Sequence, residues 1–367
     1  MLRTTAITAM ASLLFTSAGQ ADVPRVATDI APVHGLVARV MQGVGTPDLV
    51  VQPGASPHGY SMRPSEALAL NRADFVFWMG EALTPWLVGS VETLAADATV
   101  IELLDADGVI ALPFREGARF AGHDDDHAEE GHDGAHEEGE HDHDGHEDAH
   151  EEGEHDHDSH DEGHEDGDHD HDHGHEGVDP HAWLAPENGK LWLDLIATEL
   201  AKHDPDNAEA YRANAAAGRA EIDQAVVTVD AGLAPLRSGG FVVFHDAYQY
   251  FETSFDLSAL GAISLSDASS PSPARIAEVR DTVAELGASC VFSEPQFNPG
   301  LVATVLDGTG AGTAVLDPLG AKLVATVLDG TGAKTAVIDP MGIEIPLGPQ
   351  FYTALLMDLG QRMADCS

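Results

Sequence analysis

The sequence predicts an α/β protein with two regions of largely parallel sheet. Short strand-like stretches alternate with helical ones across residues 24–118, and the alternation returns after residue 240. Between these regions, residues 205–236 are alanine-rich and keep a helical period. Alternating strands and helices are typical of βαβ units, and a helix of about 30 residues is long enough to run between two lobes.

The two regions contain the expected elements in regular order. Strands are predicted at 23–28, 48–52, 75–79, 100–103, 241–244 and 290–293, and helices at 32–42, 63–71, 83–91, 186–202, 205–236, 272–286 and 351–364. Of the 367 residues, 43% are hydrophobic. The chain is therefore long and apolar enough for two domains with a sizeable core.

The N-terminus has the pattern of a secretory signal peptide, predicted at residues 1–21. Arg3 precedes the apolar stretch Ile7–Phe15, and small residues before Asp22 offer a cleavage site. The apolar run is too short to span a bilayer, and no cysteine near the cleavage site could carry a lipid. We expect a soluble protein exported to the periplasm.

Residues 123–177 have an extreme composition. They hold 26 of the 63 acidic residues and 16 of the 21 histidines, with no Lys or Arg, and part of the tract repeats after 14 residues. Such a segment buries too little surface to fold alone and is expected to be disordered without metal. Its histidines indicate loose binding of a transition metal, without deciding which one. The accessory ligands are expected to be His141, His143, His155, His157, His169, His171, His173 and His175.

The net charge of −46 lies largely in this tract, and no basic patch is present. Binding to nucleic acid is therefore not expected.

The chain has two cysteines, Cys290 and Cys366. In an oxidising compartment this even count favours one disulfide.

A tandem duplication of a helix–strand unit covers residues 301–322 and 323–344. The run Leu301-Val-Ala-Thr-Val-Leu-Asp-Gly-Thr-Gly-Ala recurs from Leu323, and similarity continues into the following strand. Two copies are too few for a solenoid. We interpret the duplication as an insertion that displaces one copy from the sheet.

Three histidines outside the tract occupy positions suited to binding a metal. His58 follows an apolar strand, His181 lies where the ordered sequence resumes, and His245 ends the run Phe241–Phe244. Ligands of open α/β sheets bind beyond the carboxyl ends of the strands, and three neutral imidazoles suit Zn²⁺. A fourth ligand could be Asp317, Asp339 or a water molecule.

Three further residues that could bind or orient a metal ligand have simpler interpretations. His34 is expected to cap or pack a helix, and His203 to lie in solvent. Glu294 follows the strand at 290–293, where it could orient an imidazole or pack against the sheet.

The sequence is similar to a known protein family over nearly all of its length, from Val23 to Cys366. The chain resembles the periplasmic zinc-binding receptors of ATP-driven zinc importers, the ZnuA type. The motifs that carry this resemblance are Pro53-Gly-Ala-Ser-Pro-His, Asp179-Pro-His-Ala-Trp-Leu, Phe244-His-Asp-Ala-Tyr, Phe292-Ser-Glu-Pro-Gln-Phe and the Asp-Pro-Leu/Met-Gly strand end. An acidic, His-rich insertion before the second motif is also typical of zinc members.

The resemblance implies two lobes, each a mainly parallel sheet flanked by helices, joined by a long rigid helix, with the metal in the cleft between them. The N-terminal lobe would be 22–204, the linking helix 205–236 and the C-terminal lobe 237–367. His58 and His181 would come from the first lobe and His245 from the second. The family's two cysteines match Cys290 and Cys366, which supports the disulfide.

Two departures from the family affect the fourth ligand. Some members have a ligating glutamate where this chain has Pro57, and the family has one copy of the duplicated unit. We prefer Asp339 over Asp317 because its copy connects directly to the C-terminal segment.

The expected function is high-affinity capture of Zn²⁺ in the periplasm and delivery to an ABC transporter permease with its cytoplasmic ATPase. A periplasmic metallochaperone is a further candidate partner, and the chain is expected to act as a monomer, not an enzyme. Three alternatives remain open: a receptor for manganese, copper or nickel, a periplasmic zinc buffer, and a zinc hydrolase.

Overall fold

The computed structural model describes residues 23–115, 120, 177–264, 274, 278, 288, 290–296, 313–315, 324–326 and 334–366. All of them belong to one compact unit, formed by residues 1–122 and 176–367. The predicted signal peptide and nearly all of the His-rich tract lie outside the described residues. Of the helix predicted at 272–286, only Ala274 and Glu278 are described, and both are helical.

The first sheet has four parallel strands in the order β2-β1-β3-β4. Its strands are β1 (Val26–Thr28), β2 (Asp48–Leu49), β3 (Phe75–Trp78) and β4 (Thr99–Glu102), and the helices that follow the first three are α1 (Ala31–Val40), α2 (Pro64–Arg72) and α3 (Val88–Leu94), the last preceded by η1 (Pro85–Leu87).

Both faces of this sheet are covered. Along β3, Phe75 and Phe77 pack into the core shared with α1, whereas Val76 and Trp78 pack with α2 and α3. Successive side chains of a strand point to opposite faces. A strand that is buried on both faces must therefore be apolar at every position, as β3 is.

The second sheet is also parallel and has the order β10-β7-β5-β6. Its strands are β5 (Phe241–His245), β6 (Ala259–Ser264), β7 (Cys290–Ser293) and β10 (Lys334–Val337), and α6 (Gln249–Ser254) connects β5 to β6. The fold class is thus the predicted one: two parallel sheets flanked by helices, with a long helix.

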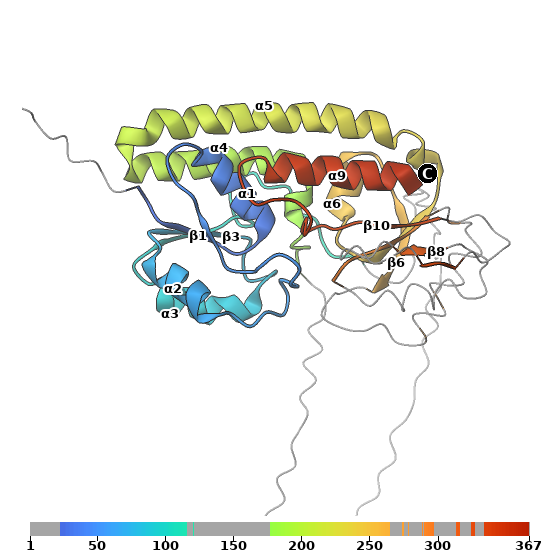
Figure 1. Ribbon diagram of the computed structural model, residues 1–367, viewed down its shortest axis with the longest axis horizontal. Coiled ribbons are helices and arrows are strands. Elements are labelled where there is room, and N and C mark those ends of the chain that lie inside the picture. The colour runs from blue at the N-terminus through green and yellow to red at the C-terminus, as the bar shows by residue number, and fades with distance from the viewer. Residues whose placement is uncertain are drawn as a thin grey trace, which may run out of the picture. The chain divides into compact units, whose positions relative to one another are not determined.

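Of the three long helices, α5 (Ala208–Leu233) packs along both of the others, α4 (Pro186–His203) and α9 (Phe351–Cys366). Helix α5 contacts α1 and α4, which belong with the first sheet, and α9, which packs on β10 of the second (Figure 1). The long helix predicted at 205–236 is α-helical for 26 residues and is flanked by the 3₁₀ turns η3 (Pro205–Asn207) and η4 (Leu236–Ser238). None of the helices in the described ranges combines the length and the apolar character that a bilayer-spanning helix needs.

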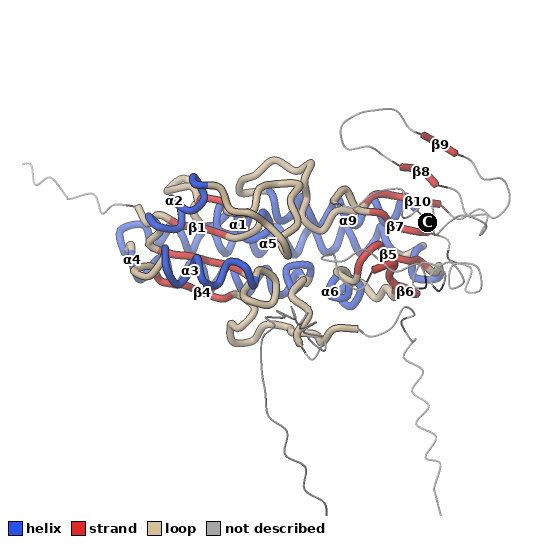
Figure 2. Tube along the Cα trace, turned by 90° about the horizontal axis from the view of Figure 1, so that it is seen from below, coloured by secondary structure: helices blue, strands red, loops and turns tan. Residues whose placement is uncertain are grey.

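The duplicated unit does not form the same structure twice. In the second copy, Lys334–Val337 is β10 of the main sheet, whereas Thr313–Val315 of the first copy (β8) pairs antiparallel with β9 (Val324–Thr326) in a separate sheet (Figure 2). The prediction that the second copy begins as a helix is wrong for residues 324–326. Valine and threonine favour strands, and β8 supplies the pairing partner. Asp317, which follows β8, lies outside the described residues.

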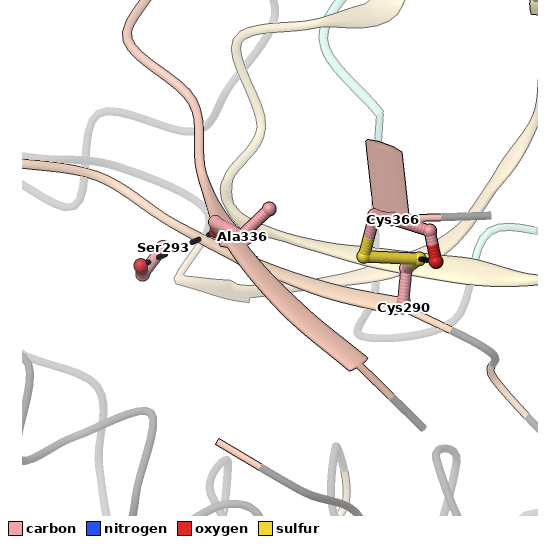
Figure 3. The surroundings of a disulfide bond; sticks show 4 residues. All are labelled: Cys290, Ser293, Ala336 and Cys366. Carbon is pink, nitrogen blue, oxygen red and sulfur yellow. Dashed lines mark hydrogen bonds between the residues drawn. A yellow bond between two sulfur atoms is a disulfide. The ribbon is translucent and has the colours of Figure 1, made fainter. Parts of the chain in front are cut away.

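Cys290 and Cys366 form the predicted disulfide (Figure 3). Their Cα atoms are 5.9 Å apart, and the bond closes a loop of 76 residues. It ties the first residue of β7 to the last residue of α9. At the other end of β7, the Ser293 hydroxyl donates to the carbonyl of Ala336 at 3.4 Å and joins β7 to β10.

Candidate metal centre

The three predicted histidines meet in one small cavity. His58 lies in the loop after β2, His181 immediately precedes the 3₁₀ turn η2 (Ala182–Leu184), and His245 is the last residue of β5. The cavity has a volume of about 10 Å³ and is lined by Pro57, His58, His181, Trp183, His245, Glu294, Gln296, Pro340 and Met341. It therefore has room for a single species of about the size of an ion or a water molecule.

Two of the imidazoles already have the spacing of zinc ligands. The Nε2 atoms of His58 and His181 are 3.4 Å apart. Two nitrogens bound tetrahedrally to Zn²⁺ at their usual bond length are separated by about 3.3 Å. The ring centres of His181 and His245 are 5.2 Å apart, in an edge-on arrangement. As the side chains stand, no three His, Cys, Asp or Glu residues within the described ranges are close enough to share one ion. A metal bound by all three imidazoles would therefore draw His245 toward the other two.

Asp179 holds the His181 imidazole. Its Oδ1 atom lies 2.7 Å from His181 Nδ1 and also accepts a hydrogen bond from the His181 backbone N–H at 2.9 Å. Burial raises the pKa of Asp179 to about 7, although the His181 backbone N–H opposes the shift. The contact leaves Nε2 as the nitrogen that would bind a metal, the usual arrangement of a carboxylate behind a ligating histidine. Asp179 opens the motif Asp179-Pro-His, and its role becomes evident only from this contact.

Glu294 holds His245 in the same way. Its Oε1 atom lies 2.7 Å from His245 Nδ1, the contact that the sequence suggested for this residue. Both side chains are buried, and burial raises the pKa of Glu294. Because β5 and β7 are parallel neighbours, His245 at the end of one and Glu294 just past the other lie at the same sheet edge.

Asp339 follows β10 at this edge and is buried. Its Oδ1 accepts hydrogen bonds from Gln296 Nε2 at 2.8 Å and from the Met341 N–H at 2.9 Å, and Oδ2 accepts from the Ile343 N–H at 2.5 Å. The next residues, Pro340 and Met341, line the cavity, whereas Asp339 itself is not in the lining. Among the described residues, Oδ1 accepts two hydrogen bonds and Oδ2 accepts one, which leaves a lone pair of Oδ2 for another partner.

The walls of the cavity are fixed by two tryptophans. The indole N–H of Trp183 donates to the carbonyl of Pro340 at 2.9 Å, and that of Trp86 donates to the carbonyl of Pro57 at 2.7 Å. Trp183 is fully buried, and its ring centre lies 5.3 Å from that of His181. Neither hydrogen bond could be predicted from the sequence, because the partners are 29 and 157 residues apart along the chain.

The other two histidines of the described residues lie apart from this cavity. His34 is buried in α1 and contacts the Pro47 carbonyl at 3.2 Å, so it packs as expected. His203 is exposed at the end of α4, with its ring edge-on to Phe75. The eight accessory histidines predicted in the tract are outside the described residues.

Known proteins similar to this chain share its fold and most of its length. A family model described as the periplasmic zinc-uptake complex component A, ZnuA, matches residues 26–326. The high-affinity zinc uptake system protein ZnuA of Brucella abortus (strain 2308) is 44% identical over 341 residues, 93% of this chain and 91% of that protein. Its counterpart in Paracoccus denitrificans (strain Pd 1222) is 44% identical over 360 residues, 97% of this chain and 96% of that protein. A crystal structure of ZnuA at 19% identity has a TM-score of 0.64 and covers 94% of this chain and 99% of the other.

Proposed function

The chain belongs to the ZnuA family of periplasmic zinc-uptake components, and we propose that it captures Zn²⁺ with His58, His181 and His245. It then passes the ion to the membrane permease of an ABC-type importer, which is driven by a cytoplasmic ATPase. The observation that carries the proposal is the pair of His58 and His181 Nε2 atoms at 3.4 Å, the spacing expected of two zinc ligands. His181 and His245 each have a buried carboxylate behind the other ring nitrogen.

The fourth position is assigned to Asp339, with a water molecule or Asp317 as the alternatives. Asp339 lies beside the cavity, and its Oδ2 accepts only the Ile343 N–H among the described contacts. Zinc affinities of Asp339→Ala and Asp317→Ala variants decide between them. If only Asp339→Ala binds zinc more weakly, Asp339 is the fourth ligand. If only Asp317→Ala does, Asp317 is the fourth ligand. If neither variant differs from the unaltered chain, the fourth ligand is a water molecule.

The protein acts as a receptor and not as a catalyst. A cavity of about 10 Å³ is far smaller than the pockets that hold organic substrates. Three histidines with an open fourth position also describe a catalytic zinc site. Absence of hydrolase activity from the zinc-loaded protein is therefore the expected result.

The His-rich tract, residues 123–177, collects metal for the cleft. Many weak sites on a tethered segment raise the local concentration of exchangeable zinc.

The protein acts in the periplasm, to which the predicted signal peptide directs it, and it acts as a monomer. A periplasmic metallochaperone remains a candidate partner for the tract.

Zinc titration calorimetry on a variant that lacks residues 123–175 tests the function. One site with nanomolar or tighter affinity should remain, about −12 kcal/mol or better, and a further His181→Ala substitution should abolish it. Competition with Mn²⁺, Cu²⁺ and Ni²⁺ checks the choice of metal. Loss of all tight binding on deletion would instead make the protein a zinc buffer.

A further inference from the structure

The base of the His-rich tract is a short two-stranded stem, formed by residues 112–115 and 177–179. Pro113 and Val178 make an antiparallel bridge. The Asp179 N–H donates to the Leu112 carbonyl at 2.8 Å, and the Phe114 N–H donates to the Gly177 carbonyl at 3.4 Å. One strand of the stem contains Arg115. The other leads through Asp179 directly to the ligand His181.

Arg115 joins this stem to the second sheet through two buried carboxylates. Its Nε lies 3.0 and 3.2 Å from the two oxygens of Asp246, and Nη2 contacts the same carboxylate. Nη1 and Nη2 donate to the two oxygens of Glu252 at 2.8 and 2.9 Å. The side chains of Asp246 and Glu252 are only 4% and 3% exposed, and that of Arg115 is 17% exposed. The guanidinium also lies 3.8 Å from the centre of the Phe120 ring.

Tyr250 of α6 makes a second connection between the same parts. Its hydroxyl donates to the Asp179 carbonyl at 2.7 Å and accepts a hydrogen bond from the Leu112 N–H at 2.9 Å. Both strands of the stem are therefore tied to α6.

The contacts of Arg115 and Tyr250 involve residues that adjoin or hold two of the proposed ligands, His245 and His181. Asp246 directly follows His245, so its Cα is about 3.8 Å from that of the ligand. Asp179 holds the imidazole of His181. A metal site requires ligand distances that are correct to within about 0.2 Å. An element that joins the backbones of two ligands can therefore affect affinity without touching the ion.

We propose that Arg115 is a positioning residue for zinc capture: by pairing with Asp246 and Glu252, it holds the stem that carries His181 against the β5–α6 turn that carries His245, and so sets the separation of these two ligands. The inference rests on the proposed zinc function. By holding these two ligands near each other, Arg115 keeps small the distance that His245 has to move before all three imidazoles can share one ion.

An ordinary structural ion pair is the competing explanation, and the chain offers a matched control for it. Arg39 of α1 makes a bidentate pair with Glu221 of α5, at 2.9 Å for both contacts, and its side chain is 9% exposed. This pair joins two helices and contacts none of the residues that line the cavity. Loss of either arginine should lower stability, since each leaves a carboxylate without its partner. Only the loss of Arg115 should change the metal site.

The experiment compares the full chain with its Arg115→Met, Arg115→Lys and Arg39→Met variants. The zinc dissociation constant of the tight site is measured by competition with a nanomolar chelator, the zinc dissociation rate by stopped flow, and the thermal midpoint without metal. We expect Arg115→Met to weaken zinc binding about 10- to 100-fold, the usual effect of losing a group that supports a metal ligand. Arg115→Lys should recover part of this, because it keeps the charge but not the planar fork. Arg39→Met should lower the midpoint and leave zinc affinity unchanged.

A second pair of variants covers the case in which Arg115→Met does not fold. Tyr250→Phe removes the hydroxyl that joins the stem to α6. Tyr211→Phe removes a comparable buried hydroxyl, bonded to Asp204 at 2.9 Å. Tyr250→Phe should weaken zinc binding several-fold, and Tyr211→Phe should not. The inference is overturned if Arg115→Met, or Tyr250→Phe in its place, binds zinc within about twofold of the unaltered chain. If the unaltered chain itself shows no tight zinc site, the proposed function fails instead.

Discussion

The two carboxylates behind the candidate ligands, Asp179 and Glu294, fix which nitrogen of each imidazole can bind a metal. Asp179 Oδ1 lies 2.7 Å from His181 Nδ1, and Glu294 Oε1 lies 2.7 Å from His245 Nδ1, so Nε2 is the metal-binding atom of both rings. Both carboxylates stand in motifs of the sequence. Arg115 belongs to no motif, and its partners Asp246 and Glu252 are more than 130 residues away along the chain. The ligand types could thus be predicted from the sequence, whereas the contacts that fix their positions needed the fold.

Asp29 gives a prediction at the same scale. Its side chain is fully buried after β1, where one oxygen accepts the Ile30 N–H at 2.7 Å and the other accepts the Met79 N–H at 2.8 Å. Burial raises the pKa of Asp29 to about 7, whereas in the unfolded chain it is about 3.9. Between these values the folded state holds a proton that the unfolded state releases. The contribution of Asp29 to stability is therefore fully present below about pH 4 and is lost as the pH rises through about 7.

An Asp29→Asn variant, which cannot ionise, should lack this part of the pH dependence. At pH 5 it should be less stable than the unaltered chain by about 1–3 kcal/mol, because an amide NH₂ replaces an oxygen that accepts a backbone N–H. The difference should shrink as the pH rises from 5 to 8. Urea unfolding of both proteins without metal, at each pH, measures it. A difference that stays constant over this range would contradict the raised pKa.

At the scale of elements, the contact between α5 and α9 depends on the absence of a side chain at Gly360. A Cβ atom there would lie 2.7 and 2.9 Å from the two methyl groups of Val229. Such distances are well below van der Waals contact, so the helices would have to move apart. Gly232 also lies in α5, but a Cβ atom there meets nothing within 4 Å. The same substitution at these two glycines should therefore have opposite effects.

We expect Gly360→Ala to lower the free energy of unfolding by about 1–3 kcal/mol. Gly232→Ala should raise it by about 0.5–1 kcal/mol, because alanine has less conformational freedom to lose in a helix. Urea unfolding monitored by circular dichroism gives both values. Equal effects of the two substitutions would mean that the α5–α9 contact does not depend on the close approach at Gly360.

Most elements were predictable from the sequence because their apolar patterns are local. The strands β3 and β7 and the helices α2, α4 and α9 lie within two residues of the predicted bounds at each end. Strand β6, Ala259–Ser264, was missed because it contains glycine, alanine and serine, with isoleucine as its one β-branched residue. It is a strand because β5 pairs with it. The strand β9 was mistaken for a helix because its sequence duplicates a segment for which a helix was predicted, and the duplication does not show which copy occupies the sheet.

At the scale of the whole molecule, the disulfide joins the second sheet to the layer of long helices. Cys290 begins β7 and Cys366 ends α9. The candidate metal site is at the opposite end of β7, where Glu294 holds His245. Stability and zinc binding should therefore respond differently when the disulfide is removed.

A Cys290→Ala/Cys366→Ala double variant should lose about 2–5 kcal/mol of unfolding free energy, close to the ~4 kcal/mol that closure of a 76-residue loop contributes in the entropic model. Its zinc affinity at 20 °C should stay within about threefold of the unaltered chain, because the carboxylate that orients His245 is held by β5 and β7 and not by the disulfide. Urea unfolding and chelator competition measure the two quantities, and the unaltered chain in reducing agent is the control for the thiol state. Parallel losses of stability and of zinc affinity would show that α9 must be fastened to β7 before the ligands can meet.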